Sequence, residues 1–485
     1  MSGTGITLFI EIISWAIIGY MLAAGAIYLV LFLVASPKIS KEKKLNRQEQ
    51  IEEMSINKDT YPISILVPAY NEEAGVASTV RSLLNLNYPQ YEIIVVNDGS
   101  TDKTSEKVMA QFKMEPIELA IRTHFKTGEI KRAYRSSLHP NLFLIEKENG
   151  GKADALNAGV NFSRYPYFAA IDGDSILEQD ALLKTMKPIV DSSGMVTATG
   201  GTVRIANGCK INRGVIEQVA LPKKPLEVMQ IIEYFRAFLI GRLGFSRVNI
   251  LLIISGAFGV FEKSRVIKVG GYKTDTVGED MELIVRLHRS IKDEKSKQRI
   301  EYIQDPVCWT EAPSTVASLR AQRIRWQRGL AETLWTHRGM MFNPKYRGIG
   351  MFSMPYYVFI ELLSAVFEVM GYFIIIGGFA FSFIETDIAV IMLLVMVLYG
   401  SLLSALAVLL EEWTYHKYPT VRSILVLYVY ALTETFWYRI LMNFWRVQGL
   451  FYAFKKKSVW GDMERKGVFS DDEQKEGSLY DPRPI

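Results

Sequence analysis

Apolar residues are distributed unevenly along the chain. Long runs almost free of charge occupy residues 6–36 and 351–454, whereas residues 37–350 mix apolar and polar positions as soluble domains do. A helix rises about 1.5 Å per residue and the hydrocarbon core of a bilayer is about 30 Å thick, so runs of this length predict membrane-spanning helices. The pattern therefore predicts a soluble domain between membrane segments.

Within the middle segment, short apolar stretches alternate with amphipathic ones. The alternation is typical of a parallel sheet with crossover helices. Ligands of such sheets bind beyond the carboxyl ends of the strands, so polar clusters at those ends are candidate sites. The predicted strands are 63–68, 92–97, 142–146 and 167–171, and the predicted helices are 74–86, one from about 102, and 152–161.

The first apolar run, Ile6–Ser36, predicts an uncleaved span, because it lacks a basic start and is too long for a signal-peptide core. Lysines and one arginine between Lys38 and Arg47 follow directly, which places this flank in the cytoplasm by the positive-inside rule. The predicted organisation is a transmembrane helix at 1–36, a linker at 37–60, an α/β domain at 61–335, interfacial helices with about three spans at 336–454, and a tail at 455–485.

The C-terminal apolar region divides into three runs. Pro355–Ser382 and Thr386–Leu410 are each long enough to span, and the acidic link between them suits the outer side. The third run, Ile424–Phe454, carries charges and predicts one span followed by an interfacial helix. Three such spans after an N-terminal one would leave Lys455 and its neighbours outside, against the charge rule, and the sequence does not resolve this conflict.

Composition narrows the functional classes. The net charge is +5, but no basic stripe interleaved with aromatic residues occurs in the soluble part, so we expect no nucleic-acid partner. The only two cysteines, Cys209 and Cys308, lie far apart, which excludes a disulfide framework or zinc knuckle and fits a reducing compartment.

Polar clusters follow several of the predicted strands. Asp172 and Asp174 flank one glycine at a strand end, where two carboxylates can hold Mg²⁺ or Mn²⁺ together with diphosphate oxygens; an acidic turn is the plain alternative. Asp98 lies in an Asn-Asp-Gly-Ser sequence that also favours turns. Lys152 follows two glycines and indicates either a phosphate cradle or a solvated helix start.

Two further clusters lie later in the domain. Asp280 is near the start of a predicted helix, where it is either an N-cap or a general base for a sugar hydroxyl. Gln322, Arg325 and Trp326 share one helix face, on which the indole suits a sugar ring and the guanidinium suits a diphosphate. A second reading, which can hold together with the first, is an amphipathic interfacial helix whose arginines, Arg320, Arg323 and Arg328 among them, meet lipid head groups.

Taken in order, these motifs resemble the processive family 2 glycosyltransferases, a group that includes cellulose, hyaluronan and poly-N-acetylglucosamine synthases. The likeness covers about 61–335 and implies a GT-A (Rossmann-like) α/β domain in the cytosol, with flanking transmembrane helices in the cytoplasmic membrane. The motifs are Pro-Ala-Tyr-Asn-Glu, Asn-Asp-Gly-Ser, Gly-Gly-Lys, Asp-Gly-Asp, Ser-Gly-Ala-Phe, Gly-Glu-Asp and Gln-x-x-Arg-Trp.

The resemblance also implies roles for individual residues. Asp280 would be the catalytic base and Asp174 the ligand of Mg²⁺ or Mn²⁺. The UDP-sugar would be bound by Tyr70, Asn71, Glu72, Asp98, Lys152 and Asp172. The acceptor sugar and the diphosphate would be contacted by Ser255, Gly256, Phe258, Gln322, Arg325 and Trp326.

The implied reaction is an inverting transfer from UDP-N-acetylglucosamine or UDP-glucose to a growing β-linked polysaccharide, which the spans would conduct across the bilayer. An accessory membrane or extracellular subunit is a further expected partner. The family member that makes cellulose carries a cyclic-dinucleotide-binding domain after its last spans, and this chain ends too soon for one. The alternatives are a non-processive enzyme acting on a lipid carrier, an inactive scaffold and a transporter; the last is disfavoured by the small number of spans.

Overall fold

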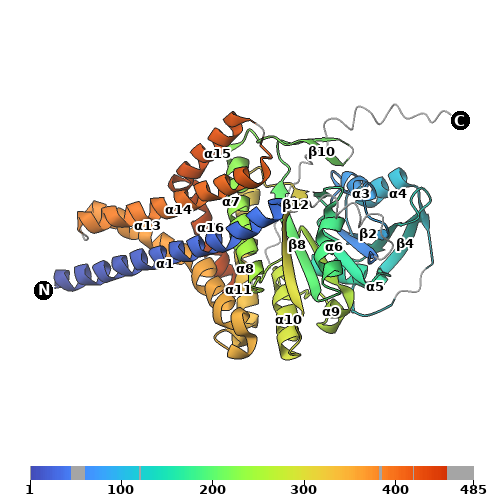
Figure 1. The fold of residues 1–485 in the computed structure, drawn as a ribbon, viewed down its shortest axis with the longest axis horizontal. Helices are drawn as coiled ribbons and strands as arrows, with labels where there is room; N and C mark the ends of the chain where they lie inside the picture. Colours follow the sequence, from blue (N-terminus) through green and yellow to red (C-terminus); the bar gives the residue numbers. More distant parts are fainter. Residues whose placement is uncertain are drawn as a thin grey trace.

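The computed structural model describes residues 2–44, 60–118, 122–212, 214–381, 385–418 and 420–455. A mixed sheet of ten strands forms the core of one region, and long apolar helices extend from it on one side (Figure 1). The predicted tail lies outside the described residues from 456 onward, as does the predicted linker from 45 to 59.

The sheet is parallel at its centre. Strand β1 pairs in parallel with β2 and β6, and β2 pairs in parallel with β5, while β11 runs antiparallel between β6 and β8. Consequently the carboxyl ends of β1, β2, β5 and β6 meet at one edge. In spatial order the strands are β3 (Met114–Pro116), β4 (Ile130–Ser136), β5 (Leu142–Lys147), β2 (Tyr91–Asn97), β1 (Ile63–Ala69), β6 (Tyr167–Ile171), β11 (Phe258–Glu262), β8 (Val196–Ile205), β12 (Arg299–Thr310) and β7 (Ser175–Leu177).

Helices follow these strands as the apolar periodicity predicts. All four predicted strands and the three predicted crossover helices are confirmed, with ends that differ by a few residues. The helices of this domain are α3 (Val76–Leu84), α4 (Thr104–Phe112), α5 (Lys152–Phe162), α6 (Ala181–Asp191), α7 (Pro225–Phe235), η1 (Arg236–Arg242), α8 (Leu243–Arg247), α9 (Lys263–Lys268), α10 (Glu279–Asp293) and α11 (Val316–Thr336). A separate hairpin, β9 (Lys210–Asn212) and β10 (Val215–Gln218), follows β8.

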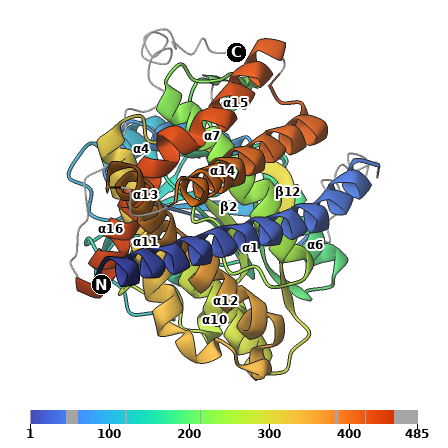
Figure 2. The ribbon, with the colours of Figure 1, turned by 90° about the vertical axis from the view of Figure 1, so that its left-hand side faces the viewer.

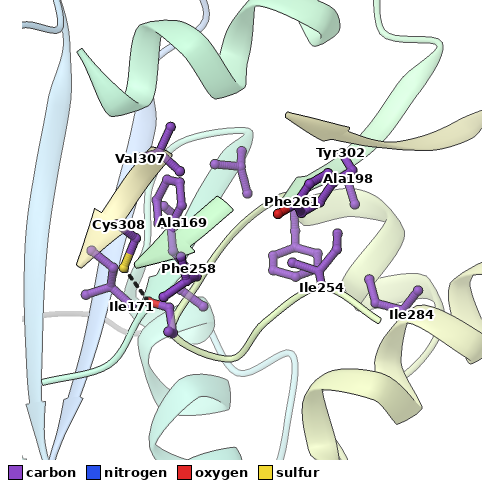
Figure 3. Close-up of a cluster of buried hydrophobic side chains, with 14 of the residues drawn as sticks. Ala169, Ile171, Ala198, Ile254, Phe258, Phe261, Ile284, Tyr302, Val307 and Cys308 are labelled. Carbon is purple, nitrogen blue, oxygen red and sulfur yellow. Dashed lines mark hydrogen bonds between the residues drawn. The ribbon is translucent and has the colours of Figure 1, made fainter. Parts of the chain in front are cut away.

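The sheet interior beneath the candidate site is filled by apolar side chains. Ile171 and Phe258, at facing positions of β6 and β11, are both fully buried. The thiol of Cys308 points at the carbonyl oxygen of Ala257 from 3.8 Å away (Figure 3). This packing fixes the end of β6, from which the Asp172 turn emerges.

The apolar helices include α1 (Ser2–Lys44), α13 (Ser364–Phe381) and α14 (Thr386–Tyr415), which extend together away from the sheet in Figure 1. Figure 2 shows α1 running beside α14, and Ile17 and Met21 of α1 pack with Met392 and Met396 there. Within the part of the chain that the structure describes, three helices are long and apolar enough to cross a membrane: Leu8–Ser36, Ile349–Gly378 and Thr386–Tyr415. Helix α1 also continues to Lys44, through the first part of the predicted linker.

The third C-terminal run forms a bent pair of helices, and one span followed by an interfacial helix stays a prediction for it. It forms α15 (Val421–Thr433), η6 (Glu434–Phe436) and α16 (Tyr438–Lys455), which together resemble a span only as a pair bent by 52°. Helix α15 has 13 residues and is about 20 Å long, shorter than the hydrocarbon core. Short helical turns link α11 to α13: η2 (Arg338–Met340), η3 (Pro344–Tyr346), η4 (Ile349–Ser353), α12 (Met354–Tyr356) and η5 (Tyr357–Leu362).

Candidate functional site

The turn after β1 is bonded to the loop after β2. The amide of Asn71 donates to the hydroxyl of Ser100 at 3.0 Å, and the side-chain oxygen of Asn71 accepts from the amide of Thr101 at 2.9 Å. The amide of Glu72 donates to the hydroxyl of Thr104 at 2.9 Å. Tyr70, at the tip of the turn, is 44% exposed. The turn thus presents an aromatic ring at the sheet edge on a fixed backbone.

Asp98 is buried and anchors the neighbouring glycine loop. Its carboxylate accepts from the amides of Gly150 and Gly151 at 3.0 and 2.7 Å, and from the ammonium of Lys147 at 2.5 Å. Burial raises the pKa of Asp98, although the bonds from Lys147 and the loop oppose this shift. The structure therefore gives Asp98 a role in holding the loop before Lys152, and its predicted contact with the nucleotide remains a prediction.

Lys147 and Asp154 belong to the same cluster, and the motifs alone did not indicate them. The Lys147 ammonium, fully buried, lies 2.6 Å from the carboxylate of Asp154 as well as against Asp98. The one available signal was a lysine two positions after the apolar stretch Leu142–Ile145, because a buried cation requires nearby carboxylates.

The Asp172-Gly-Asp174 turn is held from two sides. The carbonyl of Gly173 accepts from the hydroxyl of Thr79 on α3 at 2.8 Å, and the amide of Asp172 donates to Ala257 at 3.3 Å. Asp174 is 8% exposed. No group of three or more His, Cys, Asp or Glu residues that could hold a metal ion occurs among the described residues. Mg²⁺ is commonly held by one or two carboxylates together with substrate phosphates, so this turn fits a metal that the diphosphate helps to bind.

Lys152 joins the donor side of the site to the helix that carries Asp280. Its ammonium lies 2.5 Å from Asp172 and 3.6 Å from Glu279, the first residue of α10. Burial disfavours the charge on Lys152, but the carboxylates of Asp172 and Glu279 outweigh it and raise the pKa of the ammonium. Burial likewise raises the pKa of Glu279, against the opposing charge of Lys152. Lys152 is therefore a cation paired at this site; it is also the first residue of α5, and its role as a phosphate cradle stays a prediction.

Asp280 is tied to the Ser255–Phe258 turn. One carboxylate oxygen accepts from the amide of Gly256 at 3.0 Å, and the carbonyl of Gly256 accepts from the Lys152 ammonium at 3.3 Å. Helix α10 is capped by Gly278, so the N-cap alternative for Asp280 is wrong. Gly256 consequently places the carboxylate of Asp280 next to the Lys152–Asp172 pair.

The Gln322–Trp326 motif on α11 has an exposed indole, that of Trp326, and a guanidinium without a bonding partner among the described residues, that of Arg325. Trp326 is 43% exposed. Among the described residues, Arg325 makes no hydrogen bond or ion pair, and its charge opposes the rise that burial causes in the pKa of the nearby Glu279. The other arginines of the helix bond within the protein: Arg320 to Gln448, Arg323 to Glu233, and Arg328 to Glu332. The reading in which arginines of this helix meet lipid head groups stays a prediction, and Arg320 is exposed.

Helices α10 and α11 are also joined by buried polar groups. Glu282 accepts from the ring of His337 at 3.1 Å, and the side chain of Glu332 accepts from Thr276 and the amide of Val277. The whole arrangement combines a carboxylate able to act as a base, two cationic groups and an exposed indole around one sheet edge. Those groups are what a transfer of a sugar from a diphosphate requires.

Two protein-family models match this chain. The family described as Glycosyl transferase family 2 matches residues 64–209, and Glycosyl transferase family group 2 matches residues 167–403. The chain is 31% identical over 296 residues to the poly-beta-1,6-N-acetyl-D-glucosamine synthase of Staphylococcus epidermidis, covering 61% of this chain and 60% of that protein. It is 31% identical over 274 residues to the synthase of Staphylococcus aureus, covering 56% and 55%. The chain thus spans about 55–60% of the length of these relatives.

Among solved structures, the mannosyltransferase of Pyrobaculum calidifontis in complex with GDP-Man and Mn²⁺ is similar in fold, with a TM-score of 0.51. The alignment covers 87% of this chain and 99% of that one at 17% identity. The predicted α/β GT-A fold class with apolar flanking helices is confirmed.

Proposed function

This chain belongs to the family 2 glycosyltransferases, and from that we propose that it transfers sugar from a UDP-sugar to a growing β-linked polysaccharide at the cytoplasmic membrane. The observation that carries the proposal is the position of Asp280. Its carboxylate, held by Gly256, lies beside the Lys152–Asp172 pair on the donor side. A base for the acceptor and cations for the leaving diphosphate therefore occupy one site.

The reaction follows from these positions. Asp280 takes the proton of the acceptor hydroxyl, whose oxygen forms a bond to the anomeric carbon as the bond from that carbon to the diphosphate oxygen breaks. Lys152 and Arg325 stabilise the negative charge that develops on the departing diphosphate. Inversion of an α-linked donor gives a β linkage. A Mg²⁺ or Mn²⁺ ion, which Asp174 would hold, would add charge stabilisation to the departing diphosphate.

The donor-side residues have distinct tasks in this proposal. Tyr70, exposed at the tip of its turn, offers a stacking surface for the base of the nucleotide. Asp98 acts on the donor through the Gly150–Gly151 loop that it anchors, since that loop precedes Lys152. UDP-N-acetylglucosamine is the favoured donor, because relatives 31% identical to this chain are poly-beta-1,6-N-acetyl-D-glucosamine synthases, and UDP-glucose is the alternative.

The membrane helices support a multi-pass protein with its catalytic domain in the cytosol. Three candidate spans flank the α/β domain, and the lysines after the first span favour the cytosolic side. Trp326, exposed beside the base-bearing helix, favours an enzyme that keeps a polymer and extends it, because an indole face binds successive sugar rings. We propose that the spans conduct this polymer across the bilayer.

UDP release from the purified full-length protein in liposomes tests the proposal. Donors would be UDP-N-acetylglucosamine and UDP-glucose, with Mg²⁺, Mn²⁺ or a chelator, and products would be sized on a gel. Metal-dependent release with one donor and a high-molecular-weight product is expected. Short or lipid-linked products alone would instead favour transfer to a lipid carrier, and absence of release with every donor would contradict the proposal.

A further inference from the structure

Arg323 lies at the centre of a buried polar cluster that joins three helices. Its guanidinium donates to the carboxylate of Glu233 on α7 at 2.7 Å, and the same oxygen of Glu233 accepts from the hydroxyl of Tyr438 on α16 at 2.7 Å. Arg323 is 3% exposed. A buried charge of this kind stays in place only when it is paired, so Glu233 and Tyr438 fix the guanidinium.

The same guanidinium contacts two residues of the Gln-x-x-Arg-Trp motif. One of its nitrogens donates to the side-chain oxygen of Gln322 at 2.9 Å. Its central carbon lies 4.2 Å from the centre of the Trp326 ring, within the range of a cation–π contact. Arg323 thus orients both side chains, although it has no exposed surface with which to contact a sugar itself.

The hydrogen bonding of Arg323 is incomplete, which argues for a role beyond stability. Its Nε atom is buried without a hydrogen-bond partner among the residues that the structure describes. Leaving a buried donor unpaired costs free energy, and well-formed interiors rarely keep such groups. The guanidinium therefore bonds Glu233 and Gln322 and stacks on the ring of Trp326, and this position leaves its Nε atom unpaired.

We infer that Glu233 and Arg323 are positioning residues for the acceptor: they hold the indole of Trp326 and the amide of Gln322 in the orientation that binds the apolar face and hydroxyls of a pyranose ring. The inference rests on the proposed function. A lysine at 323 keeps the charge and the pairing with Glu233, but it lacks the planar group that stacks on the indole and reaches Gln322.

The test compares Arg323→Lys with the wild type in the liposome assay, using UDP-N-acetylglucosamine and a short β-linked N-acetylglucosamine oligosaccharide as added acceptor. Arg320→Lys is the matched control, since Arg320 is exposed on the same helix and bonds only Gln448. We expect Arg323→Lys to raise the KM for the oligosaccharide about tenfold and to shorten the products, while the KM for the donor and donor hydrolysis stay within twofold. Arg320→Lys should match the wild type.

Wild-type product length in Arg323→Lys, or equal losses of transfer and donor hydrolysis, would overturn the inference while leaving the proposed function intact. A wild-type protein that forms no product would instead overturn the proposed function, and the inference with it. If Arg323→Lys fails to fold, Glu233→Gln takes its place, because glutamine keeps an acceptor oxygen for the guanidinium. That variant should shift the acceptor KM in the same direction, and a wild-type acceptor KM in Glu233→Gln would overturn the inference.

Discussion

Gly278 and Gly329 contact each other backbone to backbone. A methyl group built on Gly329 would lie 2.8 Å from the Cα atom of Gly278, and one built on Gly278 would lie 2.9 Å from the Cα atom of Gly329. Gly278 caps α10, which carries Asp280, and Gly329 follows Trp326 on α11 by one helical turn. This contact therefore sets the spacing between the proposed base and the acceptor-side helix.

Substituting Gly329 by alanine should slow sugar transfer with little effect on donor binding. The added methyl group meets backbone atoms, which cannot rotate away, so α11 must move relative to α10. Displacements approaching 1 Å at a catalytic site can cost about a hundredfold in rate, and we expect a loss of about tenfold to a hundredfold in kcat. Gly339→Ala is the control, because nothing lies within 4 Å of a methyl group there. Equal activity in the two variants would mean that the contact does not set the site geometry.

The variant Asp280→Asn should lose transfer while it still binds the donor. Asparagine keeps the shape of the side chain and its acceptor oxygen for Gly256, but it cannot take a proton. The loss of a general base typically costs about a hundredfold to ten-thousandfold in rate. UDP release and UDP-sugar affinity, measured on the same preparation, separate the two effects, and Asp293→Asn at the other end of α10 serves as the control. Normal turnover in Asp280→Asn would show that another group is the base.

Lys147→Met should destabilise the domain and weaken UDP binding together. Removing the ammonium leaves two buried carboxylates, those of Asp98 and Asp154, without their cation. Breaking a buried ion pair by removing one partner costs about 3–5 kcal/mol. The Gly150–Gly151 loop then loses its anchor, because Asp98 holds both amides. Thermal unfolding and UDP titration measure the two effects.

Lys131→Met is the matched control for this prediction, since Lys131 is exposed on β4. It should change the unfolding free energy by no more than about 0.5 kcal/mol. If Lys147→Met were as stable as this control, the ion pairs of Lys147 with Asp98 and Asp154 would not stabilise the domain.

The raised pKa of Glu279 predicts a pH-dependent stability. A carboxyl whose pKa is higher in the folded state binds its proton more tightly there, so its contribution to stability falls as pH rises through the folded pKa. Glu279→Gln removes this titration, and its melting temperature relative to wild type should therefore increase between pH 5 and pH 8. Differential scanning of both proteins at several pH values checks the sign.

Glu294→Gln provides the contrast. Bonds from Ser290, Lys268 and Arg265 lower the pKa of Glu294 to about 2, so its folded and unfolded values both lie below this pH window. Its melting temperature relative to wild type should stay constant from pH 5 to pH 8. A constant difference for Glu279→Gln as well would contradict the raised pKa.

Much of the fold could be predicted because local signals agree with the final structure. The buried strands and crossover helices from residue 63 to residue 171 have strong apolar periodicity, and their polar ends meet where parallel strands end. The distant motifs could be ordered along the chain but not placed against one another. The bond from Gly256 to Asp280 and the pair of Lys152 with Asp172 depend on tertiary packing that no local pattern encodes.

The parts that the sequence could not supply are mostly buried polar contacts. Lys147, Arg323 and Glu233 belong to no catalytic pattern, and the bonds Lys147–Asp98, Arg323–Glu233 and Tyr438–Glu233 join residues between 49 and 205 positions apart. The end of the chain shows the same limit. The apolar content from Ile424 onward predicts a span. The sequence does not show the 52° bend at η6, nor that Arg446 of α16 bonds Gln327 of α11.

The bent pair of α15 and α16 suggests how the number of membrane crossings can agree with the positive charges that follow α16. Gly449 of α16 packs so closely on α11 that a methyl group there would lie 2.7 Å from the carbonyl oxygen of Ile324, and Arg446 donates to Gln327 of α11 at 3.0 Å. Helix α11 belongs to the α/β domain, so α16 stays on the side of that domain. With the α/β domain in the cytosol, as proposed, three crossings would place Lys455 in the cytosol as well, in agreement with the positive-inside rule.

Labelling of single introduced cysteines in intact cells tests this topology. A membrane-impermeant maleimide should label Thr386→Cys, at the exposed start of α14, and should not label Phe451→Cys, exposed near the end of α16. The wild type is the blank, because Cys209 and Cys308 both lie in the α/β domain. Permeabilised cells, in which both positions should react, control for accessibility. Labelling of Phe451→Cys from outside would show that α15 and α16 cross the bilayer together as one bent span, and that the chain has four crossings.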